Sequence, residues 1–184
     1  MLPRHSLTSQ VMSSLQHTWK NQERLSLTTK TCIYHALVLF VLLYTAETWS
    51  LLSTDSRALE AFHMKCQRQL LQIKWHQFIW NEDISTTIGL PSISYTISHW
   101  RNALYGHVAR LPDDVPAHKA LNCHINLSLS RPPSSQWRRR PGHPHSRWEI
   151  HLWTDNNLPP ADFWRGAVDC GHSGVTLRPL PAKQ

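Results

Sequence analysis

The sequence lacks the closely spaced cysteines of zinc ribbons and knuckles. Its four cysteines, separated by 34, 57 and 47 residues, are Cys32, Cys66, Cys123 and Cys170. Structural zinc sites usually take two cysteines that are about two to four residues apart, so this class of site is excluded. We expect free thiols in a reducing compartment, the nucleus or the cytoplasm. The start of the chain has no apolar run behind its first basic residue, which argues against secretion.

Long hydrophobic runs are also missing. The longest, Ala36–Tyr44, holds nine apolar residues, whereas a helix needs about 20 to span a bilayer. We therefore expect a buried helix here and no membrane partner. The sequence also has no glycine-rich phosphate loop, and no serine with a histidine and a carboxylate in a recognisable order. The common nucleotide-binding and serine hydrolase motifs are thus excluded.

Positive charge is what the sequence has in excess. It contains 19 Lys and Arg against 12 Asp and Glu, which gives a formal charge of +7 and a pI of about 9.6. A chain of this charge is attracted to polyanions such as nucleic acid. With 12 prolines and only 6 glycines, its connections should be stiff and extended.

Apolar residues at three- and four-residue steps predict a mostly α fold, an irregular helical bundle. The expected helices cover 1–25, 32–52, 53–73, 81–89 and 92–111, with two shorter ones at 148–153 and 160–168. The hydroxyls of 26–29 should cap the second helix, and Gly89 should end the fourth. Arg101 falls on the predicted solvent side of the fifth helix.

Four tryptophans fall on or beside apolar faces, and we expect them to pack in the core. They are Trp49, Trp75, Trp80 and Trp100.

Proline changes the helical pattern after Leu111, since six prolines interrupt 112–147. The predicted organisation is a helical region over 1–111, a disordered Pro/Arg-rich linker over 112–147, and short helices with an irregular tail over 148–184.

Five short blocks follow one another in one order along nearly the whole chain. They are Leu42–Trp49, Leu59–Ile73, Thr87–Pro91, Arg101–Asp114 and Trp137–Gly142. This order resembles the region after the polymerase palm in LINE-type, non-LTR retrotransposon reverse transcriptases. The sequence departs from the family at Thr45, where the family tends to have glycine, and at His143 and His145, where it tends to have a basic run.

The resemblance implies a thumb-like helical region and a basic tail that helps to hold template RNA and target DNA. Polymerases of this type hold two Mg²⁺ ions on paired aspartates at a tight hairpin. The only adjacent pair, Asp113–Asp114, lies between Pro112 and Pro116, which prevent a ladder-bonded hairpin. We therefore expect a turn there, no polymerase activity and no cofactor.

Metal binding by histidine has little support in the sequence. The histidines around the proline-rich part, with one cysteine, are His143, His145, His151, His172 and Cys170. None of them has the paired spacing of a zinc site, so we predict no metal.

The stretch from Arg131 to Arg147 contains five arginines and no acidic residue. Arginine neutralises phosphates and tryptophan stacks on unpaired bases, which predicts an interface for single-stranded RNA or DNA. Its candidate residues are Arg131, Trp137, Arg138, Arg139, Arg140, Arg147 and Trp148. A solvated basic tail or a nuclear localisation signal would explain the same residues.

Three functional hypotheses remain open from the sequence. The chain is a non-catalytic fragment that binds nucleic acid, a helical module that binds a protein or itself through exposed apolar surface, or a decayed relic without function. His143 and His145 favour the decayed relic. The family tends to be basic at these positions, and one base change converts an arginine codon into a histidine codon.

Overall fold

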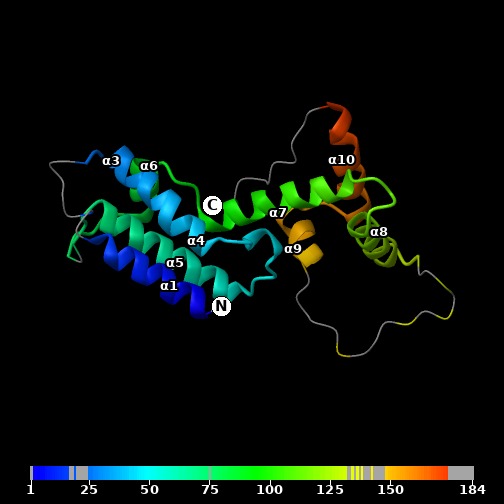
Figure 1. Ribbon diagram of the computed structural model, residues 1–184, viewed down its shortest axis with the longest axis horizontal. Helices are drawn as coiled ribbons and strands as arrows, with labels where there is room; N and C mark the ends of the chain where they lie inside the picture. Colours follow the sequence, from blue (N-terminus) through cyan, green and yellow to red (C-terminus); the bar gives the residue numbers. More distant parts are fainter. Residues whose placement is uncertain are drawn as a thin grey trace. The chain divides into compact units, whose positions relative to one another are not determined.

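The computed structural model describes residues 2–16, 19, 25–74, 76–131, 134, 136, 138, 142 and 148–173, without the side chains of 2–7 and 170–173. Every regular element among these residues is a helix (Figure 1), which confirms the mostly α fold. The chain divides into two compact units, 1–45 with 53–94 and 46–52 with 95–184. This division does not coincide with the boundary that we predicted at residue 111.

Short and medium-length helices build the first unit. They are α1 (Leu2–Ser14), α3 (Leu27–Ile33), the π-helical segment η1 (Tyr34–Leu39), α4 (Phe40–Leu42), α5 (Ser53–Leu70) and α6 (Asn81–Ile88). Helix α1 packs against η1 and α4, and α3 contacts both α5 and α6 (Figure 1). The predicted apolar stripe of α5 is confirmed, since Leu59, Phe62, Cys66 and Leu70 are all buried.

Two predicted helix ends are confirmed by their caps. The Ser26 hydroxyl accepts a hydrogen bond from the Thr29 N–H at 3.2 Å and begins α3. At the end of α6, Gly89 has a φ of 74° and its N–H donates to the Ser85 carbonyl at 2.8 Å. Both are the caps expected from the residue types, because serine accepts from free N–H groups and glycine tolerates the left-handed conformation.

The predicted helix over 32–52 is too long. Helical structure that began at Leu27 ends at Leu42, and a turn over 43–45 leads to the short 3-10 helix η2 (Ala46–Thr48), which belongs to the second unit. Thr45 stands in this turn with a φ of 59°. Such a conformation stops a right-handed helix and is unfavourable for a β-branched residue.

A buried polar cluster joins η1 to α5 in the first unit. His63 lies between Tyr34 and Gln67, with its Nδ1 2.8 Å from the tyrosine hydroxyl and its Nε2 2.6 Å from the glutamine amide nitrogen. Because a neutral imidazole has one N–H group and one bare nitrogen, the His63 ring donates at one of its nitrogens and accepts at the other. Burial lowers the pKa of His63 to about 4, so the buried ring is neutral at ordinary pH.

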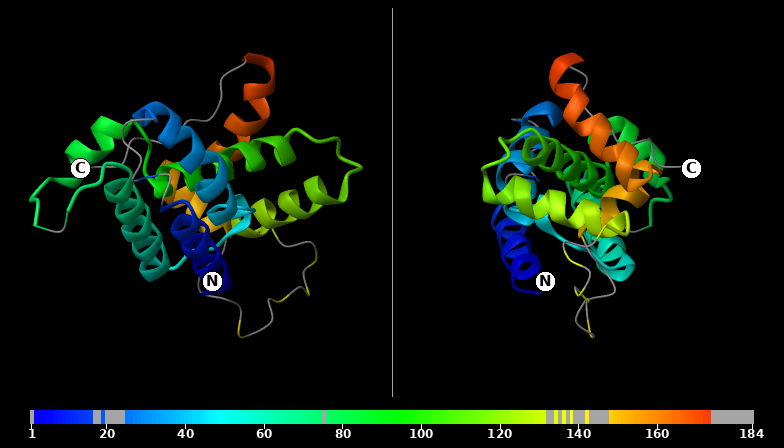
Figure 2. Two further views of the ribbon diagram at one scale, coloured as in Figure 1. Left: turned by 60° about the vertical axis from the view of Figure 1, so that its left-hand side comes forward. Right: turned by 90° about the vertical axis from the view of Figure 1, so that its right-hand side faces the viewer.

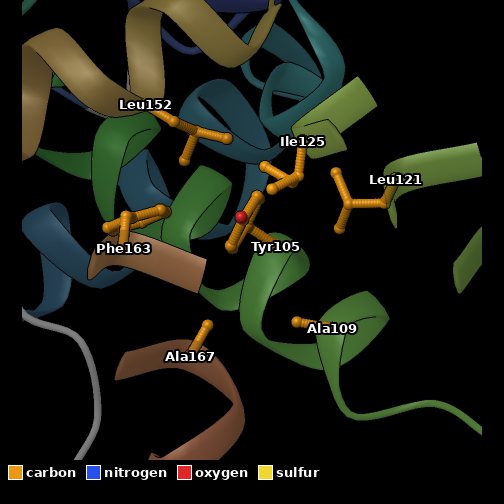
Figure 3. Packing of buried hydrophobic residues seen from close by; sticks show 7 residues of the cluster. All are labelled: Tyr105, Ala109, Leu121, Ile125, Leu152, Phe163 and Ala167. Carbon is orange, nitrogen blue, oxygen red and sulfur yellow. The ribbon is translucent and has the colours of Figure 1, made fainter. Parts of the chain in front are cut away.

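The second unit contains η2 and four longer helices. They are α7 (Ile93–Ala109), whose first two residues belong to the first unit, α8 (Pro116–Ser128), α9 (Trp148–Asn156) and α10 (Pro160–Ser173). Helix α8 returns alongside α7 after the turn at 110–115 (Figure 2). Their core is a cluster of Tyr105, Ala109, Leu121, Ile125, Leu152, Phe163 and Ala167 (Figure 3). The Tyr105 ring lies at its centre, 4.7 Å from that of Phe163.

Helix α8 occupies part of the chain that we predicted to be a disordered linker, 112–147. The sequence shows a helical pattern only over Pro116–Leu121, whereas α8 continues to Ser128, so the disorder predicted for this part was wrong. Pro116 stands at the first position of α8, where its fixed φ favours a helix and its missing N–H costs nothing. Burial of Leu121 and Ile125 against the core then stabilises the helix.

The buried face of α7 differs from the predicted one. Arg101 was expected in solvent, but its side chain is only 4% exposed. It belongs to a buried row at four-residue steps that also holds Ile93, Ile97, Tyr105 and Ala109. The prediction was wrong because a charged side chain can be buried when a distant acid neutralises it, and spacing within one helix does not reveal that acid.

The tryptophans behave differently from one another. Trp49 and Trp100 are partly buried, in line with the core packing that we predicted. Trp80, in contrast, is 78% exposed, so the prediction was wrong for this residue, which lies in a loop rather than on a helix face. Trp75 lies outside the described residues.

The strain at Thr45 can be measured by comparing two substitutions. Both Thr45→Gly and Thr45→Ala remove the threonine side chain, but only glycine relieves the left-handed backbone. We expect the glycine variant to have a free energy of unfolding about 1 kcal/mol higher than the alanine variant. Urea denaturation followed by far-UV circular dichroism measures both. An alanine variant at least as stable as the glycine variant would contradict the strained turn.

Burial of neutral His63 predicts a loss of stability in acid. Its pKa of about 4 in the folded chain lies below the value of about 6.5 in an unfolded chain, so the unfolded chain binds more protons between these values. The free energy of unfolding should therefore fall as the pH falls from about 6.5 to about 4, by about 3 kcal/mol. Urea denaturation at several pH values should show a shallower dependence for His63→Gln and an unchanged one for His107→Gln, whose histidine is exposed.

Candidate nucleic-acid interface

The basic segment begins at a well-defined helix end. At the end of α8, Ser130 has a φ of 59° and its N–H donates to the Leu127 carbonyl at 3.2 Å, while the Arg131 N–H donates to the Asn126 carbonyl at 2.8 Å. This pair of bonds is the Schellman motif, which closes the end of a helix and turns the chain away from its axis. The backbone of Arg131 is thus held to the second unit.

The other end of the segment is held to the same unit. Trp148 begins α9, and its indole N–H donates to the Glu47 carbonyl at 2.6 Å. The next residue, Glu149, has a carboxylate oxygen 3.2 Å from Nδ1 of His124 on α8. Because both flanking helices belong to one core, the segment over 131–147 connects two points of one unit. Arg131 and Trp148, the described residues at the two ends of this segment, are thus both held to the second unit.

The predicted contact residues fall into three groups. Arg131 and Arg138 are exposed. Trp148 is partly buried, and its ring lies 6.2 Å from that of Tyr105 in the core. The rest lie outside the described residues, namely Trp137, Arg139, Arg140 and Arg147. Trp148 is therefore a packing residue, and we no longer assign base stacking to it.

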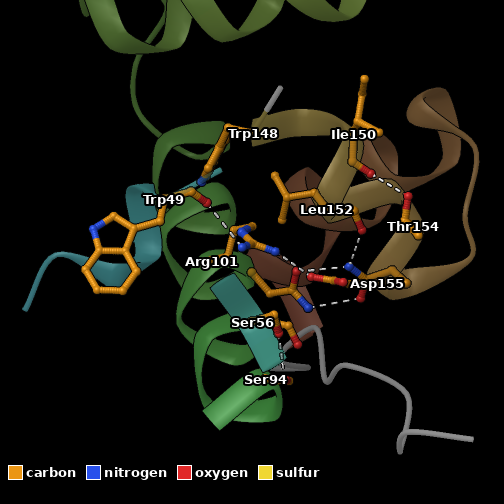
Figure 4. A network of polar contacts seen from close by, with 12 residues as sticks. Trp49, Ser56, Ser94, Arg101, Trp148, Ile150, Leu152, Thr154 and Asp155 are labelled. Atoms are coloured by element: carbon orange, nitrogen blue, oxygen red, sulfur yellow. Dashed lines mark hydrogen bonds and ion pairs between the residues drawn. The ribbon is translucent and has the colours of Figure 1, made fainter. Parts of the chain in front are cut away.

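An ion pair of the buried Arg101 and the partly buried Asp155 lies in the second unit. Arg101 of α7 places Nη1 2.6 Å from a carboxylate oxygen of Asp155 on α9, and its Nη2 donates to the Trp49 carbonyl at 3.2 Å (Figure 4). Burial raises the pKa of Asp155, and the neighbouring guanidinium offsets part of this rise. The guanidinium itself stays charged at any ordinary pH. It thus connects three segments that are far apart in the sequence.

The residues that follow Arg101 on α7 and Asp155 on α9 are asparagines, and their side-chain amides bond to each other. Asn102 and Asn156 are both buried, and each donates an amide hydrogen to the other's carbonyl oxygen, at 3.0 and 2.9 Å. Asn156 also donates to the Leu152 carbonyl at 2.7 Å. One signal in the sequence could have predicted this site, namely the polar pair Arg101–Asn102 within an apolar helix.

The adjacent aspartates form a turn, as predicted. The Val115 N–H donates to the Pro112 carbonyl at 3.0 Å, and Asp113 and Asp114 are exposed between them. An oxygen of Asp113 lies 3.2 Å from Nε2 of His118. The role of these acids is therefore to shape the connection between α7 and α8.

A groove of about 550 Å³ lies beside this turn and is lined by residues of α7, α8 and α10. Its polar groups are largely engaged with the protein itself. Arg110 donates to the Ala167 carbonyl at 3.2 Å, and His118 lies between Asp113 and the Val108 carbonyl, with Nδ1 3.3 Å from the latter. We therefore interpret the groove as a gap between packed helices and assign no ligand to it.

Charge is distributed unevenly between helices and connections. The helices that the structure describes together carry eight Lys or Arg and nine Asp or Glu, so their side chains contribute no net positive charge. The rest of the sequence holds the positive excess, and five of its arginines lie within 131–147. A cluster of cations without acids in one segment attracts a polyanion to that segment non-specifically.

The described part of the chain contains neither a candidate metal site nor a candidate membrane-spanning helix. No three histidine, cysteine, aspartate or glutamate side chains within it lie close enough to hold a metal ion, and its Cys32, Cys66 and Cys123 are free thiols. His143 and His145, and the side chains of Cys170 and His172, lie outside it. Nor does this part contain a helix that is long and apolar enough to cross a bilayer.

Comparisons with protein-family models, with curated proteins and with solved structures found no match to this chain. Its function must therefore be argued from its own residues.

The ion pair between Arg101 and Asp155 should contribute to the stability of the fold. Asp155→Asn leaves the Arg101 charge buried without a neutralising partner, so we expect the free energy of unfolding to fall by about 2 to 4 kcal/mol. Asp162→Asn is the matched control, since its partner Arg165 is 3.6 Å away and both side chains are mostly exposed. Exposed pairs contribute less than about 1 kcal/mol. Equal losses in the two variants, measured by urea denaturation, would show that Arg101 does not depend on Asp155.

Proposed function

We propose that this chain is a non-catalytic fragment that binds single-stranded RNA or DNA through its basic segment, 131–147. The observation that carries the proposal is the position of the charge. A helical body without net positive charge is joined to one segment that holds five arginines and no acid. Such a segment neutralises phosphates and releases their counterions, which favours binding to any strand.

Anchoring at both ends supports this role. A segment held at Arg131 and at Trp148 has fewer conformations than a free tail of the same length. Less conformational entropy is then lost when the segment becomes ordered on a nucleic acid. The exposed side chains of Arg131 and Arg138 are available for such contacts.

The resemblance to LINE-type reverse transcriptases is a second support. Thr45, where that family tends to have glycine, is one of the few described residues with a left-handed backbone. A requirement for positive φ at this position explains why glycine suits it. On this proposal the chain acts in the nucleus or the cytoplasm, as a remnant without the polymerase carboxylates.

Fluorescence anisotropy of labelled single-stranded RNA and DNA tests the proposal. Five phosphate contacts predict that affinity falls about 100-fold between about 50 and about 200 mM salt, because the salt slope for single strands is about −0.7 for each contact. Changing Arg138, Arg139 and Arg140 together to alanine leaves two of these arginines. The fall should then be only about sevenfold.

The matched control removes the same charge from helix surfaces. Arg57, Lys119 and Arg165 are exposed and lie on α5, α8 and α10. Changing all three to alanine should keep both the affinity and its salt dependence close to those of the unchanged chain. The proposal fails if the two triple variants lose affinity equally, or if the unchanged chain does not bind.

A second candidate function rests on an exposed apolar ridge of the first unit. Leu37, Phe40 and Tyr44 lie at three- and four-residue steps, and each is about half exposed or more. The Phe40 and Tyr44 rings contact each other edge to face, 6.4 Å apart. A ridge of this kind is typical of an interaction surface. Concentration-dependent association in sedimentation experiments that Phe40→Glu abolishes would support self-association as the function.

A further inference from the structure

The most exposed aromatic side chains of the described residues lie far along the sequence from the basic segment, in the loop between α5 and α6. Phe78 is 100% exposed, Trp80 is 78% exposed, and Ile79 between them is also exposed. Burying a phenylalanine contributes about 1.5 to 3 kcal/mol to folding, and Phe78 contributes none of it. Two large rings in solvent at neighbouring positions indicate contact with a partner.

The loop is held in place by polar contacts. Arg68 of α5 donates from Nη2 to the Ile79 carbonyl and to the Asn81 side-chain oxygen, both at 2.8 Å. The Gln77 side-chain oxygen accepts from the Lys74 N–H at 2.8 Å, and the Gln77 N–H donates to the Lys74 carbonyl at 3.0 Å. With its backbone tied to α5 and to itself, the loop presents its rings without a large ordering cost.

The start of the loop between α5 and α6 is fixed as well. Helix α5 ends in a Schellman motif, in which Gln72 has a φ of 55° and the Ile73 N–H donates to the Arg68 carbonyl at 3.0 Å. Arg68 therefore joins the helix end, through its carbonyl, to the far side of the loop, through its guanidinium. One residue thus controls where the chain leaves α5 and where it reaches α6.

The charges within the loop and on the last turns of α5 before it are all positive. Residues 61–81 contain no acid and three cations, which are Lys65, Arg68 and Lys74. Lys65 and Lys74 are exposed. The next acids, Glu82 and Asp83, lie in the first turn of α6, where the helix dipole favours negative charge. A partner that contacts this loop thus meets positive charge on the side of α5 and negative charge only at the start of α6.

We propose that Phe78 and Trp80 are stacking platforms for unpaired bases of single-stranded RNA or DNA, with Lys74 neutralising a neighbouring phosphate. Flat rings beside cations and without intervening acids are the combination that single strands require, because stacking contributes about 1 to 3 kcal/mol per base and tolerates any base. The inference rests on the proposed function, since it assigns the chain a further contact with single-stranded nucleic acid.

The test compares a normal single-stranded oligonucleotide with an abasic strand of the same length in fluorescence-anisotropy titrations. Phe78→Ala/Trp80→Ala should bind the normal strand about 10- to 100-fold more weakly than the unchanged chain does. Its salt slope should stay the same, because no cation is removed. The abasic strand offers no ring to stack on, so both proteins should bind it equally. The conservative exchange Phe78→Trp/Trp80→Phe should retain the affinity.

The matched control removes two exposed aromatic rings elsewhere in the first unit. Phe40→Ala/Tyr44→Ala does this on the apolar ridge, and it should bind the normal strand within about threefold of the unchanged chain. Phe78 and Trp80 are mostly exposed, so circular dichroism should show that the loop variant keeps its helices.

Several outcomes overturn the inference. Unchanged binding by Phe78→Ala/Trp80→Ala does so while leaving the proposed function intact, provided that the arginine triple variant still loses affinity. Equal losses on normal and abasic strands would mean that the rings do not stack on bases. Binding to anionic phospholipid vesicles that depends on Phe78 and Trp80, with no effect on oligonucleotides, would assign the loop to a lipid surface. Absence of binding by the unchanged chain overturns both proposals.

Discussion

The second unit depends on one buried charge. The Arg101 guanidinium can leave water only because Asp155 lies 2.6 Å away and the Trp49 carbonyl accepts a further hydrogen bond. These three residues come from α7, α9 and the segment after η2, so neutralising the charge requires all three to come together. The reciprocal Asn102–Asn156 pair then fixes α9 against α7. Since α9 begins where the basic segment ends, the same contacts determine one of its two anchor points.

Charge and packing are thus assigned to different parts of the chain. The described helices supply the buried hydrophobic residues of the core and balance their own charges, whereas the positive excess of the sequence lies outside these helices. A body without net positive charge adds no long-range attraction of its own, so both proposed contacts with nucleic acid lie in segments between helices. This is the usual division of labour between a rigid scaffold and binding loops.

Sequence reasoning succeeded where the signal was local. The stripe of α5, the Ser26 and Gly89 caps, the turn at Asp113–Asp114 and the mostly α fold all follow from spacing and residue type, and the structure confirms them. It failed for Arg101 and for α8. It also failed for Trp80, because aromatic composition predicts burial and gives no sign of a loop held outward by a side chain of the preceding helix.

What the sequence determined by itself is most of the helices, the position of the positive charge and the turn at Asp113–Asp114, because each depends on residues that are neighbours in the chain. Only the tertiary structure decided that Arg101 is buried, that Trp148 packs in the core, and that the basic segment is anchored at both ends. The positions of Arg101 and Trp148 depend on partners far along the sequence, as in the hydrogen bonds from Arg101 to Asp155 and from Trp148 to Glu47. Hydrophobic periodicity reports which face of a helix is apolar, but it cannot report which distant group will meet that face.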